Sequence, residues 1–170
     1  MSHNINISNI TDYSFLQPAS DSSQGVTTAW VDVSGSQITY TPTENSDFII
    51  YEFCFLQSQD PSESSTNYMV AYYKFLYSDN NGSTWSELSN SRNFIGGLDP
   101  SLIRIRGLYN IKHCIPYWSN SARIFKLQVK KPSNTYATTL HINAGFYDDT
   151  GLLSDDRYIR PIVSCYSVTS

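Results

Sequence analysis

The chain has 170 residues, of which 40% are hydrophobic, 15% charged and 14% aromatic, and its formal net charge is −4. This length is typical of one compact domain, and the acidic balance excludes non-specific nucleic-acid binding, which requires Lys and Arg to neutralise many phosphates. The longest apolar run, 48–56, is too short for a membrane span and contains Glu52. The first residues have neither the basic nor the apolar region of a secretory signal, so none is predicted.

The composition favours strands and turns, because aromatic and β-branched residues suit a pleated sheet and Ser, Asn and Gly suit its turns. Residues 1–24 are rich in Ser, Asn, Asp and Gln and are predicted to be an N-terminal arm without a core. Residues 25–170 are predicted to be an all-β domain, an antiparallel β-sandwich of jelly-roll type with about eight to ten strands and little or no helix. The predicted strands are 26–33, 36–42, 47–57, 67–78, 84–88, 102–112, 122–131, 137–147 and 158–168.

Two of these strands, around 48–56 and 68–77, are apolar or aromatic on both faces. A two-layer sandwich hides only one face of each sheet, so such strands imply a further cover. We predict that the cover is another copy of the chain; the alternative is that loops or the N-terminal arm cover the second face within one chain. The predicted contact residues between copies are Tyr51, Phe53, Tyr72 and Tyr73.

No catalytic motif or cofactor-binding motif is present, and we predict no enzyme activity and no cofactor. The chain has no G-x-S-x-G elbow, no phosphate-binding glycine loop and no G-x-G-x-x-G. Its histidines, His3, His113 and His141, have no second ligand at metal spacing. The cysteines are odd in number and far apart, which predicts three buried free thiols, at Cys54, Cys114 and Cys165.

The segment 78–85, with the sequence SDNNGSTW, resembles the Asp-box of sialidases, with Asn80 where the Asp belongs. Sialidase propellers use several copies of this motif in a longer chain. We therefore interpret the single copy as a hairpin turn, in which the Asn80 side chain caps the backbone, Gly82 takes a positive φ and Trp85 folds back on the hairpin.

Three other groups of residues are candidate binding sites. Tyr117 and Trp118 lie between Pro116 and Ser119 and could stack on sugars; the alternative is a loop plug packed on the core. The basic residues of two consecutive predicted strands would form a stripe if those strands are neighbours: Arg104, Arg106, Arg123, Lys126 and Lys130. Such a stripe could meet the acidic loop of a neighbouring subunit or bind an anionic glycan; the alternative is ordinary solvated charges on an outward face. The segment 147–158 contains four carboxylates and is interpreted as a solvated acidic loop; the alternative is a calcium site. The ligands of that site would be Asp148, Asp149, Asp155 and Asp156.

The segment from Ala29 to Phe53, with its Trp-x-Asp-Val strand, Thr-Pro turn and long hydrophobic strand, resembles the opening of small jelly-roll domains on phage and viral appendages. The segment 159–168 is similar to the closing strand of such a domain. These domains resemble the trimeric heads of the tumour-necrosis-factor and C1q families. The chain lacks the long repetitive shaft of a fibre, which favours a short decoration or minor capsid protein.

The resemblance implies a non-enzymatic viral or phage structural protein, a homotrimer located in the virion, on the capsid surface or a tail appendage. Its partners would be copies of itself, other virion proteins and a host glycan receptor. Two alternatives stay open: a stand-alone carbohydrate-binding β-sandwich and a fragment related to glycosidases or sialidases.

Overall fold

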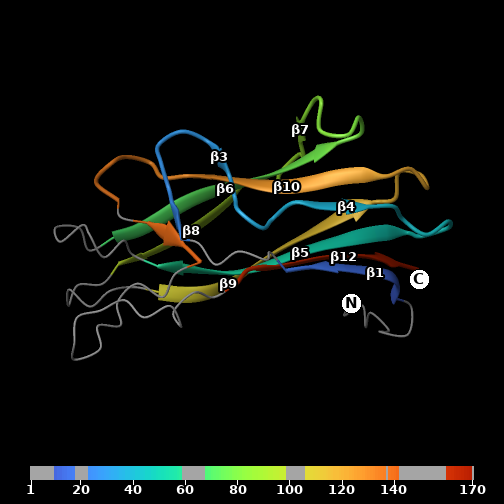
Figure 1. The fold of residues 1–170 in the computed structure, drawn as a ribbon, viewed down its shortest axis with the longest axis horizontal. Helices are drawn as coiled ribbons and strands as arrows, with labels where there is room; N and C mark the ends of the chain where they lie inside the picture. The colour runs from blue at the N-terminus through green and yellow to red at the C-terminus, as the bar shows by residue number, and fades with distance from the viewer. Residues whose placement is uncertain are drawn as a thin grey trace.

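The computed structural model of the chain describes residues 10–17, 23–58, 68–98, 106–136, 138–141 and 160–169. These residues form two antiparallel β-sheets and contain no helix. The sheets lie face to face as two layers (Figure 1). The prediction of an all-β sandwich is therefore confirmed.

Sheet A is built around β5 (Phe48–Ser58), which is paired along both of its edges. One edge pairs along its whole length with β9 (Arg106–Pro116). The other pairs first with β12 (Ile162–Val168) and then with β11 (Thr139–Leu140). The sheet is completed by β1 (Ile10–Leu16) beside β12 and by β2 (Gln24–Gly25) beside β11.

Sheet B is built around the pair of β6 (Tyr68–Ser78) and β10 (Arg123–Lys130). The far edge of β10 pairs with two short strands, β3 (Val31–Asp32) and β4 (Ile38–Tyr40). The far edge of β6 pairs with β7 (Ser86–Glu87) and β8 (Asn93–Leu98).

Four of the antiparallel strand pairs are nested, each inside the one before. β1 pairs with β12, β4 with β10, β5 with β9 and β6 with β8, so strands near the start pair with strands near the end. The successive pairs alternate between sheet A and sheet B. The described strands therefore form a succession of antiparallel pairs that runs back and forth between the two sheets.

Aromatic side chains fill the space between the sheets. Tyr51 from sheet A meets Phe75 from sheet B with ring centroids 4.7 Å apart, and Phe55 meets Tyr73 at 5.4 Å. Tilted ring pairs at these distances add specific attraction to the burial of apolar area. The fully buried residues of this core also include Ile49, Phe53, Met69, Phe125, Leu127, Val129 and Leu140.

The structure corrects which face of the two apolar strands lies inside. Tyr51, Phe53 and Tyr73, predicted to contact another copy, have no exposed area within a single chain because they lie between the sheets. Their side chains therefore cannot form a surface between copies. Tyr72 points the other way, on the outer face of sheet B, and is 38% exposed. Its role between copies stays a prediction.

Three strands, β1, β2 and β8, lie where the sequence predicted none. Part of the predicted arm 1–24 is β1, which pairs with β12. A register shift between Thr11 and Ser14, with Asp12 at φ 49°, breaks the alternation that would identify it as a strand. β8 contains Gly96 and Gly97, a residue type that is depleted in strands, yet Gly96 pairs with Val70.

Of the predicted strand 137–147, the described residues form a strand only at Thr139–Leu140. Only Thr139 and Leu140 are paired, and the strand ends where His141 takes a left-handed backbone with φ 67°. Residues 142–147 lie outside the described part of the chain.

The cysteines differ from the prediction of three buried thiols. Cys165 is buried in the core, and burial raises the pKa of its thiol. Cys54 and Cys114 are exposed, because they occupy outer-face positions of β5 and β9. All three are free thiols, as predicted.

The hairpin interpretation of residues 78–85 is confirmed. Ser78 Oγ accepts a hydrogen bond from the Gly82 amide at 2.8 Å, and Asn80 Oδ1 accepts one from the Thr84 amide at 2.9 Å. Gly82 has φ +84°, and a Cβ atom added there would lie 3.7 Å from the Trp85 ring. The segment is therefore a turn closed by its own side chains.

A buried hydrogen bond joins the two sheets inside the apolar core. The Tyr73 hydroxyl donates to Gln57 Oε1 at 2.6 Å, and both side chains are fully buried. Burial raises the pKa of Tyr73 well above its usual value, so the phenol stays protonated and remains a donor.

We expect Tyr73→Phe to lower the free energy of unfolding by about 1–3 kcal/mol, because it leaves the buried Gln57 carbonyl oxygen without its donor. Urea denaturation measures this change. The matched control is Tyr13→Phe, at a tyrosine that is 59% exposed, which should change stability by less than about 0.5 kcal/mol. Equal effects of the two variants would contradict the role assigned to this hydrogen bond.

Candidate functional site

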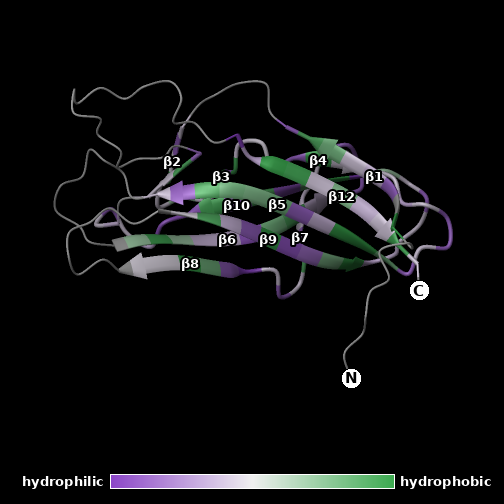
Figure 2. Ribbon diagram, turned by 90° about the horizontal axis from the view of Figure 1, so that it is seen from below, coloured by the Kyte–Doolittle hydropathy of each residue, from purple (hydrophilic) through white to green (hydrophobic). Residues whose placement is uncertain are grey.

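The outer face of sheet A is the first candidate surface. Directly paired residues of neighbouring strands point to the same face of a sheet. The pairing therefore groups the outer-face residues of β12, β5 and β9 into rows: Val168 with Phe48 and Pro116, Tyr166 with Ile50 and Cys114, Ser164 with Glu52 and Lys112, and Ile162 with Cys54 and Asn110. In Figure 2, seen from the side of sheet A, β5 carries hydrophobic residues on both sides of a hydrophilic centre.

The hydrophilic centre of this face is neutralised within the chain. Lys112 Nζ lies 2.6 Å from Glu52 Oε1, and the Tyr166 hydroxyl lies 3.3 Å from the same carboxylate. The hydrogen bond to Glu52 raises the pKa of Lys112, against the effect of burial. Because one charge of each sign is paired here, the face carries little net charge at its middle.

One corner of the face has a hollow of about 370 Å³, whose lining includes Cys54, Leu108 and Ile162 with Asn110 and Arg160 beside them. Leu108 is 70% exposed and Ile162 is 36% exposed. We call the side chains of Cys54, Leu108 and Ile162 the apolar corner. Among the described strands, β9, which carries Leu108, pairs only with β5, so its outer edge is open to a further strand.

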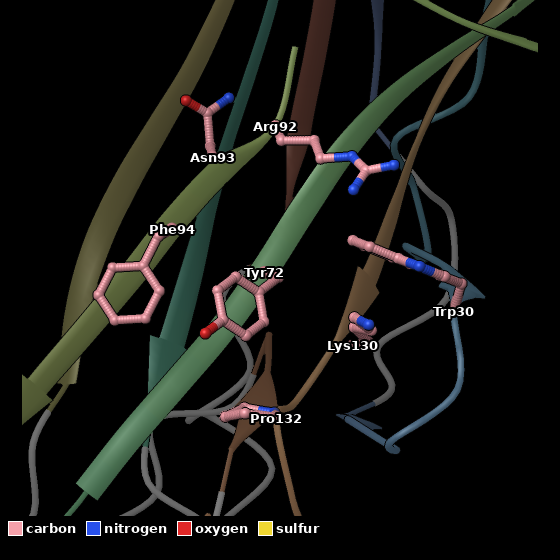
Figure 3. Close-up of a pocket in the computed structure, with 7 residues that line it drawn as sticks. All are labelled: Trp30, Tyr72, Arg92, Asn93, Phe94, Lys130 and Pro132. Carbon is pink, nitrogen blue, oxygen red and sulfur yellow. The ribbon is translucent and has the colours of Figure 1, made fainter. Parts of the chain in front are cut away.

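The second candidate surface is a groove of about 610 Å³ on the outer face of sheet B. Lys130, Tyr72 and Phe94 form one cross-strand row along its floor, on β10, β6 and β8. Figure 3 shows the Tyr72 and Phe94 rings side by side, with Trp30 beyond Lys130 on the other side of the groove. The complete lining is Trp30, Tyr72, Arg92, Asn93, Phe94, Lys130 and Pro132; we call it the aromatic groove.

The cations around the aromatic groove are held in two ways. Arg92 makes a two-point contact with Glu87, with Nε 2.7 Å from Oε1 and Nη2 3.2 Å from Oε2. This hydrogen bonding lowers the pKa of Glu87, so the carboxylate is charged at neutral pH. Lys130 and Lys74 instead place their ammonium groups 5.0 Å and 4.8 Å from the centre of the Trp30 ring.

The aromatic residues predicted to bind sugar are packed against the core. Tyr117 and Trp118 are partly buried there, and the Trp118 ring lies 5.5 Å from Phe125 and 4.6 Å from the Arg123 guanidinium. The Trp118 indole N–H donates to the carbonyl of Ser121 at 2.9 Å. Both residues occupy the position expected of a loop plug, and sugar binding by them stays a prediction.

The predicted basic stripe is not assembled, because its two strands belong to different sheets. Arg106 begins β9 in sheet A, whereas Arg123, Lys126 and Lys130 lie on β10 in sheet B. Arg104 lies outside the described residues. The four candidate calcium ligands, Asp148, Asp149, Asp155 and Asp156, lie outside them as well.

Two of the histidines are in the core region. The His113 ring lies 4.6 Å from that of Phe75, and the His141 ring lies 6.4 Å from that of Phe53. Burial lowers the pKa of each to about 4. Within the described residues, no three His, Cys, Asp or Glu side chains come together that could hold a metal ion, and no helix is long and apolar enough to cross a membrane.

Sequence reasoning named Tyr72 and Lys130 as candidates for other roles but missed Phe94 and Leu108. Phe94 lies between the predicted strands 84–88 and 102–112, and Leu108 is one of several apolar residues in the second of these. The available signal was the pair of strands apolar on both faces, which indicated that outer faces would carry apolar side chains. The pattern did not identify which residues those would be.

No family model matches the chain, and no curated protein matches it. Two crystal structures of a pentameric capsid protein isolated from metagenomic phage sequences are similar to it, each with 16% sequence identity over 74% of this chain and a TM-score of 0.24. The match covers 69% of the protein in one structure and 64% in the other. At this TM-score the likeness carries no argument about what the chain does.

The two buried histidines predict a loss of stability in mild acid. Their folded-state pKa of about 4 lies below the unfolded value of 6.5, so between these values the unfolded chain binds protons that the folded chain does not. The stability is therefore complete above about pH 6.5 and falls as the pH drops toward 4, by roughly 1–2 kcal/mol per histidine at pH 5.

Urea denaturation at pH 7 and pH 5 measures this loss. The double variant His113→Gln, His141→Asn should lose less stability between the two pH values than the parent chain; Asn is chosen because it tolerates the left-handed backbone at position 141. An equal loss in both proteins would assign the acid sensitivity to other groups.

Proposed function

We propose that the chain is a non-enzymatic structural domain of a virus or phage particle that assembles with copies of itself through the outer face of sheet A. The observation that carries this proposal is the apolar corner of Cys54, Leu108 and Ile162, beside the open edge of β9. Exposed apolar patches rimmed by polar groups mark interaction surfaces, because covering them with protein removes apolar area from water.

The charge pattern of this face supports a second copy as the occupant. Glu52 and Lys112 are paired within the chain, so two such faces do not repel each other through an unpaired charge at their centres. Within the described part of the chain, the outer edge of β9 has no partner strand, so its backbone groups can pair with a strand of another copy.

The strand order supports a jelly-roll identity for the sandwich. Nested pairs that alternate between two sheets, in the orders β1-β12-β5-β9 and β4-β10-β6-β8, are what two interlocked Greek keys produce. Jelly rolls occur in viral capsid and lectin domains. Together with the sequence resemblance over 29–53 and 159–168, this order supports a virion component, with three copies per assembly and contacts to other virion proteins.

Light scattering after size-exclusion chromatography tests the assembly. We expect a mass about three times that of the 19.2 kDa chain. A mass equal to another multiple of the chain's mass would support self-assembly and change the number of copies. A mass near that of one chain across the accessible concentrations would overturn the proposal and favour a stand-alone carbohydrate-binding module.

The substitution Leu108→Asp tests the surface. It places a charge in the apolar corner and should weaken association by at least about tenfold, because a buried unpaired charge is costly. The matched control is Phe94→Asp, a similarly exposed apolar side chain (60%) on the outer face of sheet B, which should leave the mass unchanged. Dissociation by the control alone would place the interface on sheet B.

A further inference from the structure

We propose that the aromatic groove on sheet B is a binding site for an acidic saccharide, a sugar that carries a carboxylate. The proposal assigns a site that is distinct from the Tyr117 and Trp118 loop and from the surface proposed for assembly. It rests on the shape of the groove, its three aromatic rings and the position of Lys130.

Two of the three aromatic rings, those of Tyr72 and Phe94, are exposed where a ligand can reach them, and Trp30 is half-buried. Tyr72 and Phe94 are directly paired across β6 and β8, and their ring centroids lie 5.4 Å apart. Trp30 stands on the opposite side of the groove (Figure 3). A space of about 610 Å³ is within the range of small-ligand sites. Two aromatic walls suit a ring with apolar C–H faces, as a pyranose has.

The polar groups of the groove suit the remainder of such a ligand. The Asn93 side chain and the Tyr72 hydroxyl can hydrogen-bond to sugar hydroxyls. Among the described residues, Lys130 makes no salt bridge, and its ammonium group lies against the Trp30 ring. An ammonium held by a ring face keeps hydrogen-bond donors available for a carboxylate. The groove thus offers one cation beside its aromatic rings.

Other ligand classes fit these groups less well. A wholly apolar ligand would cover Lys130 and leave its charge desolvated without a partner. A polynucleotide would bring a series of phosphates to a chain with a net charge of −4, and the other cation lining the groove, Arg92, is already engaged by Glu87. One carboxylate on a sugar matches Lys130, the lysine that lines the groove.

The test uses the three tryptophans of the full chain as reporters. Each indole N–H gives one signal in a proton–nitrogen NMR spectrum, and single Trp→Phe variants assign the signals of Trp30, Trp85 and Trp118. The probes are sialyllactose, which carries one carboxylate, and lactose, its neutral counterpart. We expect sialyllactose to shift the Trp30 signal in a saturable way and lactose to require at least tenfold higher concentrations.

Variants locate the site and its charge preference. Phe94→Ala should weaken sialyllactose binding at least tenfold, and because Phe94 is 60% exposed the fold should tolerate its loss. Lys130→Gln should remove the preference for sialyllactose over lactose. The matched control is Trp85→Phe, at a tryptophan that also contacts a lysine, with Lys126 Nζ 3.8 Å from its ring centre, but does not line the groove; it should bind as the parent does.

Several results would overturn the site. One is the absence of a saturable Trp30 shift with both sialyllactose and a galacturonic acid trimer. Others are that lactose binds as tightly as sialyllactose, or that a thymidine hexanucleotide binds more tightly than sialyllactose. The last is that sialyllactose shifts the Trp118 signal in place of the Trp30 signal. Failure of the assembly proposal is separate, because the Leu108→Asp variant should bind sialyllactose as the parent chain does, whatever its mass.

Discussion

The structure depends on β5, a strand that is paired along both of its edges and is therefore central in sheet A. Each of its two faces carries apolar side chains, and each face needs a separate cover. Its inner residues, which include Tyr51 and Phe55, are covered by sheet B and create the aromatic core. Its outer residues cannot use the same cover, because successive side chains of a strand point to opposite faces. The apolar outer face is thus a direct consequence of a strand that is hydrophobic at nearly every position.

The same constraint explains how much of the fold the sequence could predict. Long hydrophobic runs bounded by turn residues predicted β5, β6, β10 and β12 close to their observed bounds. The 78–85 turn was predictable because Asn80 can cap the backbone with its side chain and Gly82 can take a positive φ. Strands with a weak local signal were missed. β1 is broken by a bulge, and β8 contains two glycines, so their positions depend on the strands that they pair with.

The candidate sites were less predictable because they depend on which face is inside and which strands are neighbours. A strand apolar on both faces gives no sign of which set is buried, so Tyr51, Phe53 and Tyr73 were assigned to a surface that they do not reach. Likewise Lys130, Tyr72 and Phe94 come from three separate segments and meet only through the register of β10, β6 and β8. Local sequence contains no information about such a row.

The two outer faces differ in how they hold their charges, and this difference separates their proposed roles. On sheet A, Lys112 is bound directly by Glu52, which leaves no unpaired charge at the centre of the face. On sheet B, Lys74 and Lys130 rest against Trp30, and a ring quadrupole attracts an ammonium without neutralising it. An acidic chain that retains positive charge at one aromatic groove can attract an anion there while its overall charge repels polyanions. The outer face of sheet A is suited to apolar contacts between copies of the chain.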